Sequence, residues 1–292
     1  MPKQAVKTPK TKLLLADAFD FLGSLKPNSV DLIVSSPPYF MGKEYDTSMK
    51  LEDFVEHHKR LLPLLFRVLK PGGNLCWQVG HHVRKGVTTP LDAIVYSVFM
   101  AEPELLLRNR IVWTFGHGVH ARDRFSGRHE TILWYSKGED YYFDLDAVRV
   151  PQKYPGKRHY KGPKKGEWSG NPKGKNPSDI WDIPNVKAGH VEKTEHPCQF
   201  PVALAQRLVK ALCPVGGLVA DPFMGSGSTC IAALFESRNF SGCEISKKYK
   251  KIAERRLLEF KEGSIKIRSL EKPVHVPNGR EAVAQRPLHF VG

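Results

Sequence analysis

The sequence has few cysteines and no long apolar run, and both absences exclude classes of protein. No apolar stretch among the 292 residues approaches the ~20 needed to cross a bilayer. The run Leu13 to Leu15 does not form a signal-peptide core, because Asp17 and Asp20 interrupt it. The five cysteines are scattered without a CxxC pair, which argues against a disulfide framework and a zinc site. We therefore expect a cytoplasmic protein with reduced cysteines and no metal.

Acidic residues are scarce relative to basic ones. The chain carries 45 Lys and Arg against 30 Asp and Glu, so its formal net charge is +15. This charge favours a polyanionic partner, with nucleic acid first and an anionic membrane surface second. Since no segment is suited to a membrane, nucleic acid is preferred. The 41% hydrophobic content is too high for a disordered chain, and the length is sufficient to bury a large core.

Strand and helix signals alternate along the chain, which is typical of an α/β protein with parallel strands. We expect strands at residues 12–16, 30–35, 74–79, 110–115, 131–136, 218–220 and 240–244. We expect helices at 18–25, 51–69, 201–213, 229–236 and 247–260, with a kink at Pro63. Beyond Gly263 the periodicity is weak, so we expect this tail to attach loosely to the fold.

Residues 149–175 form a strongly basic segment. It holds nine Lys and Arg against one acid, Glu167, and it is rich in Gly and Pro, so we expect no regular helix. Tyr154, Tyr160 and Trp168 are interleaved with the basic residues. One interpretation is a solvated or disordered linker. The other is a loop that follows phosphates and stacks on bases, and charge alone does not decide between them.

The first motif with chemical meaning is Ser35-Ser36-Pro37-Pro38-Tyr39, which directly follows the apolar strand 30–35. Ligands of open α/β sheets bind at the carboxyl ends of the strands. The two prolines restrict the backbone there, so Ser36 and Tyr39 point in set directions. A plain turn at the end of the strand is the alternative, but the context favours a site.

The second motif is a glycine loop, Asp221-Pro222-Phe223-Met224-Gly225-Ser226-Gly227, between a strand and a helix. Glycines allow the backbone to approach a ligand closely, although a lone GxG also fits a tight turn. Glu244 ends the next expected strand, where a carboxylate can accept hydrogen bonds from ribose hydroxyls. The loop lacks the P-loop Lys and a full GxGxxG, so a nucleoside without phosphates fits it better than a nucleotide.

Together, SPPY and DPFMGSGST resemble the β class of DNA amino-methyltransferases, in which the catalytic motif precedes the cofactor motifs. Ser before Pro-Pro-Tyr is typical of the N4-cytosine type II modification enzymes. The resemblance covers residues 12–260 and includes the segments NPSDIWDIP (176–184) and KTEHPCQFP (193–201). The length and general pattern are similar to SmaI-type modification methyltransferases, which implies the target CCCGGG and a partner restriction endonuclease.

The resemblance implies a Rossmann-like, mostly parallel sheet of seven strands in the order 3-2-1-4-5-7-6, circularly permuted along the chain. Strands 1 to 5 would be 218–220, 240–244, 12–16, 30–34 and 74–79, and the two remaining strands would be 6 and 7. The SPPY motif and the glycine loop would then follow adjacent strands and lie close together. The implied domains are a catalytic half (1–138), a basic target-recognition region (139–185), a cofactor half (186–262) and a tail (263–292).

The resemblance also implies S-adenosylmethionine as the cofactor. The residues that match the family's cofactor positions are Asp17, Thr194, His196, Asp221, Phe223, Gly225, Gly227 and Glu244. Asp17 would contact the adenine, Glu244 the ribose hydroxyls, and the segment with Thr194 and His196 would close over the methionine end. Asp17 is equally well explained as a helix N-cap, which is compatible with that contact.

The implied reaction is methyl transfer to the exocyclic amine of a cytosine flipped out of duplex DNA. Ser36 and the Pro37 carbonyl would accept the amine hydrogens, while Pro38 and Tyr39 complete the motif and the Tyr39 ring stacks on the base. Holding the amine in line with the methyl group supplies much of the acceleration. The segment Pro197-Cys198-Gln199 is similar to the nucleophile motif of 5-methylcytosine enzymes, but it stands in the wrong order, so we expect Cys198 to be a packing residue.

Arginine reads guanine edges and lysine mostly contacts phosphate, so basic residues are the expected DNA contacts. The chosen residues are Arg122, Arg124, Arg128, Arg149, Arg158, Lys164 and Lys165. Three alternatives stay open: an N6-adenine methyltransferase of the same class, an RNA methyltransferase, and a catalytically inactive DNA-binding relative.

The charge distribution leads to a first prediction. Raising the salt concentration should weaken DNA binding steeply, because released counterions drive phosphate contacts, while cofactor affinity barely changes. Filter binding to duplex DNA and calorimetry with S-adenosylmethionine measure the two affinities. An equal loss of both would contradict the assignment of the basic residues to DNA.

Overall fold

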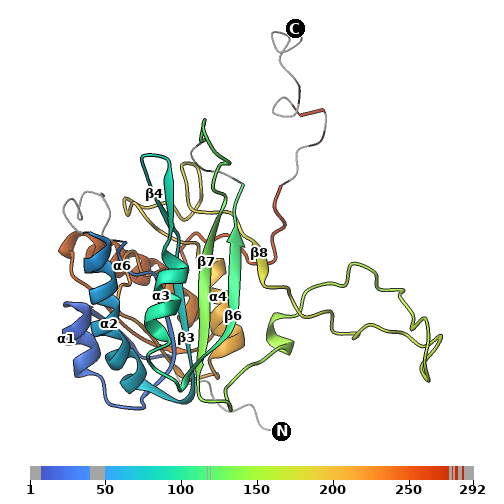
Figure 1. Cartoon of the computed structure of the whole chain (residues 1–292), viewed down its shortest axis with the longest axis horizontal. Coiled ribbons are helices and arrows are strands. Elements are labelled where there is room, and N and C mark those ends of the chain that lie inside the picture. Colours follow the sequence, from blue (N-terminus) through green and yellow to red (C-terminus); the bar gives the residue numbers. More distant parts are fainter. Residues whose placement is uncertain are drawn as a thin grey trace.

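A central sheet lies between two layers of helices in the computed structural model of the chain (Figure 1). The structure describes residues 8–39, 50–116, 118, 120–275, 278, 280–281 and 285. In this part of the chain the main sheet has eight strands in the order β1-β10-β9-β2-β3-β7-β6-β8. Their bounds are Thr11–Leu15 (β1), Val30–Ser35 (β2), Leu69–Val79 (β3), Leu105–Thr114 (β6), His129–Lys137 (β7), Ile180–Asp182 (β8), Leu218–Asp221 (β9) and Asn239–Glu244 (β10).

The order of the seven expected strands is confirmed, and one strand was not foreseen. β8 adds an eighth strand parallel to β6, so the expectation of a seven-stranded sheet is wrong by one short edge strand. β7 runs antiparallel to both of its neighbours, and the remaining pairs are parallel. That the order along the chain reflects a circular permutation stays a prediction.

Two apolar cores form because each face of the sheet is covered by three helices. Helices α1 (Ala18–Ser24), α2 (Leu51–Val68) and α3 (Leu91–Phe99) cover one face, and α4 (Val202–Leu212), α5 (Ser228–Phe235) and α6 (Lys247–Lys261) cover the other. The expected helices are confirmed to within a residue or two, and α2 continues through Pro63. In the described residues no helix has the length and apolarity that a membrane span requires.

The sequence predictions missed α3 and the hairpin that precedes it. The hairpin pairs β4 (His81–Arg84) with β5 (Val87–Pro90) through a turn at Lys85 and Gly86, both of which have positive φ. Glycine adopts this left-handed conformation without strain, so Gly86 was a readable turn signal. Helix α3 buries Leu91, Val95 and Phe99, at the spacing of one helical face.

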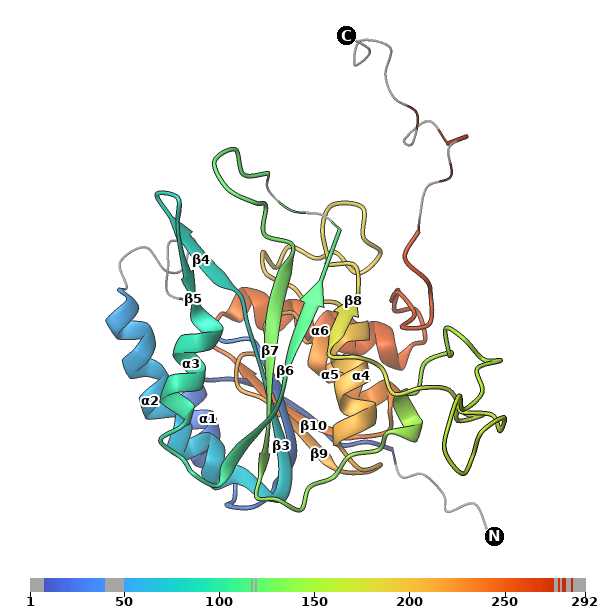
Figure 2. The same cartoon turned by 45° about the vertical axis from the view of Figure 1, so that its right-hand side comes forward.

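One edge of the sheet collects the segments that carry the motifs. Strands β1, β10, β9, β2 and β3 are parallel, so their carboxyl ends lie at the same edge. Because β7 is antiparallel to β3, its first residue also lies there. The β4–β5 hairpin and the connection between β6 and β7 (residues 115–128) rise above this edge (Figure 2).

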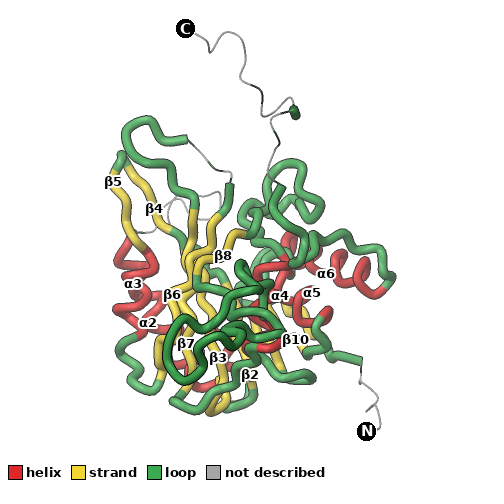
Figure 3. Tube along the Cα trace, turned by 90° about the vertical axis from the view of Figure 1, so that its right-hand side faces the viewer, coloured by secondary structure: helices red, strands yellow, loops and turns green. Residues whose placement is uncertain are grey.

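The basic segment 149–175 forms an arm that extends from the body of the protein on the side of β8 (Figure 1). It points away from the carboxyl ends of the parallel strands. It is loop throughout, as expected (Figure 3). The arm doubles back on itself, since Val150 faces Lys175 and Arg158 faces Trp168 in isolated antiparallel bridges. These bridges tie the two legs of the arm together, while most of its residues are exposed, so the solvated linker and the DNA-contacting loop both stay predictions.

The expectation of a loosely attached tail is wrong for its first part. Ile265, Ile267 and Leu270 pack against the core beside α4–α6, and the Arg268 N–H donates to the buried Glu192 carboxylate at 3.0 Å. These apolar residues lack helical spacing, so periodicity did not reveal them. Most residues after position 275 lie outside the described part of the chain.

Asn74 gives a stability prediction, because its buried amide joins three segments. Its Nδ2 donates to the carbonyls of Tyr142 and Leu212, both at 2.9 Å, and its Oδ1 accepts from the Trp134 indole at 2.9 Å. Asn74→Ala leaves these groups buried without partners, so we expect a loss of about 3 kcal/mol in the free energy of unfolding. Urea denaturation measures it, with Asn109→Ala on β6 as a half-buried control. A loss under about 1 kcal/mol, like that expected of the control, would contradict this role.

Candidate active site

The two motifs meet at the centre of the sheet edge. β2 pairs directly with β9, and at their ends the Ser35 hydroxyl donates to Asp221 Oδ1 at 2.6 Å. These residues are 186 positions apart, so the expected proximity of the SPPY motif and the glycine loop is confirmed. Sequence reasoning selected Ser36 for chemistry and gave no role to Ser35, which forms this link.

Asp221 is a buried carboxylate with one oxygen left for a ligand. Its Oδ1 also accepts from the Phe223 N–H at 3.0 Å, whereas its Oδ2 is buried without a hydrogen-bond partner. Burial raises the pKa of Asp221 to about 6, and hydrogen bonds from the Ser35 and Thr229 hydroxyls and the Phe223 N–H oppose that shift. The unsatisfied oxygen indicates that a donor or a cationic group of a ligand belongs beside it.

Glu244 shapes the glycine loop from the end of β10. Its Oε2 accepts from the Gly225 N–H at 3.0 Å and its Oε1 from the Ser246 N–H at 2.8 Å. Burial raises its pKa despite these bonds. Gly225 has a φ of +50°, and a Cβ at this position would lie 2.8 Å from Nε2 of His196. A side chain at Gly225 would therefore collide with the His196 ring, so the loop and His196 approach as closely as they do only because this residue is glycine.

The segment around His196 lies against this loop, and its closure over the methionine end of the cofactor stays a prediction. The His196 ring packs edge-on against Tyr249 at 4.5 Å, and Thr194 Oγ1 accepts from the His196 N–H at 3.2 Å. The same Thr194 hydroxyl donates to Gln199 Oε1 at 2.8 Å.

Gly227 is the N-cap of α5 and has a φ of +77°. A Cβ at this position would lie 3.0 Å from Ala253 on α6.

A buried ion pair anchors this segment to the loop. Glu192 accepts from the Val202 N–H at 2.9 Å, and Arg256 donates to the Ser226 carbonyl at 2.8 Å. The Glu192 and Arg256 side chains approach each other to 3.9 Å while both are buried. Removing one member of such a pair is costly because it leaves a buried charge without its partner. The pair therefore holds the glycine loop and the segment around His196 in one arrangement.

Aromatic rings and Asp17 complete the side of the site next to β1. The Phe223 ring lies 6.1 Å from Trp77 and 5.9 Å from His57, and burial lowers the pKa of His57 to about 4. Asp17 caps α1 by accepting from the Phe19 N–H at 2.8 Å, so its N-cap role is confirmed. Its contact with adenine stays a prediction.

The Tyr39 hydroxyl is held by several hydrogen bonds. It accepts from the Gly80 N–H at 2.8 Å and from Gln78 Nε2 at 3.2 Å, and it is hydrogen-bonded to the Ser36 hydroxyl. Gln78 also donates to Glu130 on β7. Burial and the Glu130 carboxylate keep the pKa of Tyr39 well above its usual value, so the phenol stays neutral. Pro37 is buried between these groups and the core.

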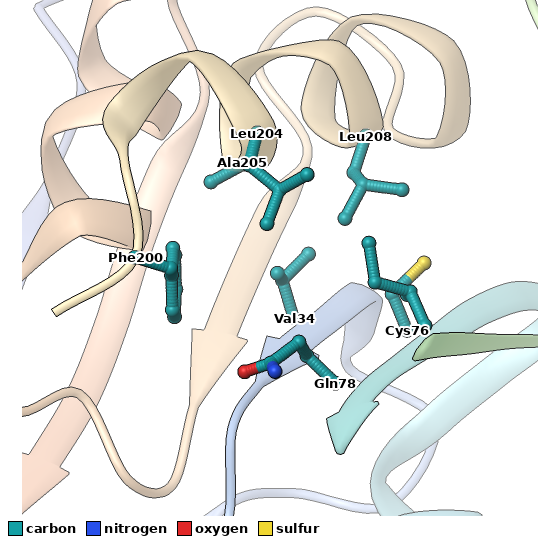
Figure 4. Close-up of a pocket in the computed structure, with 8 residues that line it drawn as sticks. Val34, Cys76, Gln78, Phe200, Leu204, Ala205 and Leu208 are labelled. Atoms are coloured by element: carbon teal, nitrogen blue, oxygen red, sulfur yellow. The ribbon is translucent and has the colours of Figure 1, made fainter. Parts of the chain in front are cut away.

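The described residues enclose a small apolar cavity beneath this network (Figure 4). Its volume is about 10 Å³, which is the space of a single water molecule, so it holds neither a base nor a cofactor. Val34 lines it from β2, Gln78 from β3 and Leu204 from α4. The cavity is therefore a packing defect beneath the site. The groups available to a ligand are the residues at the carboxyl ends of the strands above it.

The predicted DNA contacts fall into two separate groups. Arg122 and Arg124 are exposed on the β6–β7 connection above the sheet edge, and Arg128 is half-buried at its base. The second group lies on the arm, whose Lys164 and Lys165 are exposed.

Two arginines of the arm make contacts with residues in the arm or next to its base. Arg149 binds Asp146 at 2.7 Å and the Gly174 carbonyl at 3.0 Å, and Arg158 stacks on the Trp168 ring at 3.8 Å. The structure therefore brings the first group of basic residues to the site and does not bring the arm there.

Sequence reasoning missed Gln78, Glu130 and His57, and it was wrong about Cys198. Gln78 and Glu130 stand at the ends of β3 and β7, where only the antiparallel pairing of the strands makes them neighbours. Cys198 is exposed, so it is not a packing residue. Within the described ranges, no group of three or more His, Cys, Asp or Glu residues could hold a metal ion.

A mostly parallel sheet with a glycine loop, an acid at the end of the next strand and SPPY at the end of the adjacent strand is the arrangement of an S-adenosylmethionine-dependent amino-methyltransferase. Residues 30–255 match the DNA methylase family of N6 and N4 methyltransferases. The chain is 43% identical over 254 residues to the type II methyltransferase M.BglII of Bacillus subtilis, covering 87% of this chain and 70% of that protein. It therefore belongs to the DNA methylase family.

Other comparisons agree on the fold and the cofactor. The type II methyltransferase M.ScaI of Streptomyces caespitosus is 37% identical over 263 residues, covering 87% of this chain and 84% of that protein. The solved PvuII DNA methyltransferase (cytosine-N4-specific) superposes with a TM-score of 0.69 at 21% identity, over 85% of this chain and 86% of that one. A DNA modification methylase of Thermus thermophilus complexed with S-adenosyl-L-methionine superposes with a TM-score of 0.63 at 27% identity, over 91% and 100% of the chains. The cofactor of this protein is S-adenosylmethionine.

Ser35→Ala tests the link between the motifs through pH. The folded-state pKa of Asp221, about 6, lies above the ~3.9 of an unfolded aspartate, so its ionisation lowers stability as pH rises through this range. Removing the Ser35 hydroxyl raises this pKa further. We expect Ser35→Ala to cost about 1–3 kcal/mol at pH 8 and about 1 kcal/mol less at pH 5.

Urea unfolding of the variant and the wild type at both pH values measures these differences. Ser241→Ala, a buried serine of β10 outside this pair, is the control and should cost the same at both pH values. A pH-independent loss for Ser35→Ala would contradict the proposed coupling to Asp221.

Proposed function

We propose that the protein transfers the methyl group of S-adenosylmethionine to the N4 amine of cytosine in duplex DNA. The observation that carries this proposal is the hydrogen bond from Ser35, which directly precedes Ser36-Pro37-Pro38-Tyr39, to Asp221 of the glycine loop. A serine before Pro-Pro-Tyr offers a neutral acceptor to an amine hydrogen. The protein would protect its site from a partner restriction endonuclease, as type II modification enzymes do, and its target would be CCCGGG.

The cofactor supplies an electrophilic methyl group on a sulfonium. Eight residues would hold it: Asp17, Thr194, His196, Asp221, Phe223, Gly225, Gly227 and Glu244. The buried Oδ2 of Asp221, for which the structure records no hydrogen-bond partner, fits this ligand, which carries positive charge and polar ribose and amino groups. The Glu244 oxygens shape the loop and leave their remaining lone pairs for the ribose.

The chain's own residues would orient the target amine. Ser36 Oγ and the Pro37 carbonyl accept its two hydrogens, which directs the nitrogen lone pair toward the methyl group. Tyr39 stacks on the base, and its hydroxyl bonds to Gly80 and Gln78 prevent the ring from turning. The transfer is a direct displacement, so no covalent enzyme intermediate is required.

The DNA contacts would be Arg122, Arg124, Arg128, Arg149, Arg158, Lys164 and Lys165. Since Arg149 and Arg158 are engaged inside the arm, their role would be to shape it, while Lys164 and Lys165 face outward toward phosphates. The proposed division of the chain stays 1–138, 139–185, 186–262 and 263–292, with β8 now joining the second part to the sheet.

N6-adenine methylation is the second candidate. Among the relatives, the DNA adenine methyltransferase YhdJ of Escherichia coli (strain K12) is 30% identical over 250 residues, covering 84% of this chain and 82% of that protein. An adenine amine has the same geometry as the cytosine amine, so the hydrogen-bond acceptors of the site would serve both.

Product analysis with a Ser36 variant tests the proposal. Wild-type protein and plasmid DNA should give N4-methylcytosine by mass spectrometry of nucleosides, mapped by sequencing to CCCGGG. Ser36→Ala should lower kcat about 100-fold, because an acceptor used in the transition state is lost, with the Kd for the cofactor unchanged. Ser97→Ala on α3 is the control and should behave as wild type.

Four outcomes would change the proposal. N6-methyladenine without N4-methylcytosine would replace the target base, and methylation of RNA but not duplex DNA would replace the substrate. Cofactor binding without turnover on any DNA would indicate an inactive relative. Loss of cofactor binding in Ser36→Ala would contradict the division of roles between the two motifs.

A further inference from the structure

Phe125 is the most exposed large apolar residue recorded in the described part of the chain, with 99% of its surface accessible. It lies in the connection between β6 and β7, above the sheet edge that carries the active site (Figure 2). Neither the fold nor the proposed methyl transfer uses this ring. A fully exposed phenyl ring gains nothing from the apolar core, and in this loop it is accessible to a ligand bound at the sheet edge.

The loop around Phe125 is folded, so the exposure does not arise from a loose chain. The Phe115 N–H donates to the Arg128 carbonyl at 3.0 Å and closes the base of the loop. Nearer the tip, the Ala121 N–H donates to Ser126 Oγ at 3.1 Å. These bonds bracket Phe125 on both sides and hold its backbone outward.

The loop also leans on the β4–β5 hairpin. A Cβ on Gly127 would lie 2.7 Å from the His81 imidazole, and a Cβ on Gly86 at the hairpin turn would lie 3.3 Å from Asp123 Oδ2. These close approaches show that the loop packs against the hairpin. Phe125 therefore belongs to a loop whose position is restrained by a second chain segment.

Both segments adjoin residues of the Tyr39 hydrogen-bond network. Gly80, whose N–H binds the Tyr39 hydroxyl, directly precedes the hairpin. Glu130, which accepts from the Gln78 amide beside Tyr39, is the second residue of β7, two positions after the loop ends. The position of the Phe125 loop is therefore coupled through short lengths of backbone to the ring that would stack on the target base.

The charge around Phe125 matches a polyanion. Residues 115–128 contain three arginines and one acid, Asp123, and both Arg122 and Arg124 are exposed. The aromatic Trp168 on the arm differs, because the Arg158 guanidinium already covers its ring at 3.8 Å. The Phe125 ring has exposed cations beside it and no side chain over it.

We propose that Phe125 inserts into the base stack of duplex DNA and fills the space left by the flipped-out target base, with Arg122 and Arg124 on the flanking phosphates. Removing a base from the duplex costs stacking and pairing energy, and an aromatic ring in the gap restores the stacking on its neighbours. This inference rests on the proposed duplex-DNA substrate and is independent of which base is methylated.

The test compares Phe125→Ala, Phe125→Trp and wild type on two duplexes that carry the mapped target site. In one the target base is paired, and in the other it faces an abasic position, where extrusion is easier. Phe125→Ala should lower kcat/KM about tenfold or more on the paired duplex. On the duplex with the abasic position the loss should be less than about twofold. Phe125→Trp should retain activity, because its ring also stacks.

A second readout follows the extrusion step directly. With 2-aminopurine at the target position, wild-type protein should increase the fluorescence on binding, and Phe125→Ala should not. Met100→Ala, at an exposed apolar residue after α3, is the matched control and should behave as wild type in both assays. Thermal unfolding and cofactor calorimetry of Phe125→Ala should match wild type.

Three outcomes would overturn the inference: no loss in Phe125→Ala, an equal loss on both duplexes, or an unchanged fluorescence increase. Failure of the proposed function is distinguished by the wild-type product. N6-methyladenine would replace the proposed base and leave the comparison of the two duplexes valid. Methylation of RNA alone would overturn both proposals.

Discussion

The parallel pairing of β2 with β9 is the constraint on which the site depends. It brings together the ends of two strands that are 186 positions apart in the chain. A hydrogen bond of 2.6 Å from the Ser35 hydroxyl to Asp221 joins these ends. One strand leads into the residues proposed to face the target base, and the other leads into the cofactor loop. A methyl transfer needs both reactants at one place, and this single register supplies it.

Several ionisable side chains are buried around this pair of strands. Asp221 and Glu244 have raised pKa values because they are buried, and Glu192 and Arg256 form an ion pair in the interior. Each of these groups is hydrogen-bonded to backbone of the glycine loop or its cover, so the cost of burial fixes the loop's shape. A cationic cofactor would then offset part of the cost at Asp221, whose Oδ2 has no partner.

Much of the fold was predictable because it follows from local patterns. The β-branched strand 30–35, the glycine loop before α5 and the amphipathic helix at 247–260 could be recognised directly, and the order of seven strands followed from the family resemblance. The hydrogen bonds of Tyr39 to Gly80 and Gln78, and of Gln78 to Glu130, could not be predicted. The Gln78–Glu130 bond depends on the antiparallel β3–β7 register, and the Tyr39 bonds depend on the parallel β2–β3 register. A shift of one residue in the first would turn the side chain of Gln78 or Glu130 to the other face of the sheet.

The sequence by itself determined the class of chemistry, since SPPY and the glycine loop are local motifs whose residue types set what they can bind. It also indicated the net positive charge and the polyanionic partner. Only the tertiary structure decided where the charge lies: the arm extends beyond β8, while the β6–β7 connection, which carries the exposed Arg122 and Arg124, rises above the sheet edge of the site. The reason is physical, because composition is a property of the chain, whereas position is set by strand pairing between distant segments.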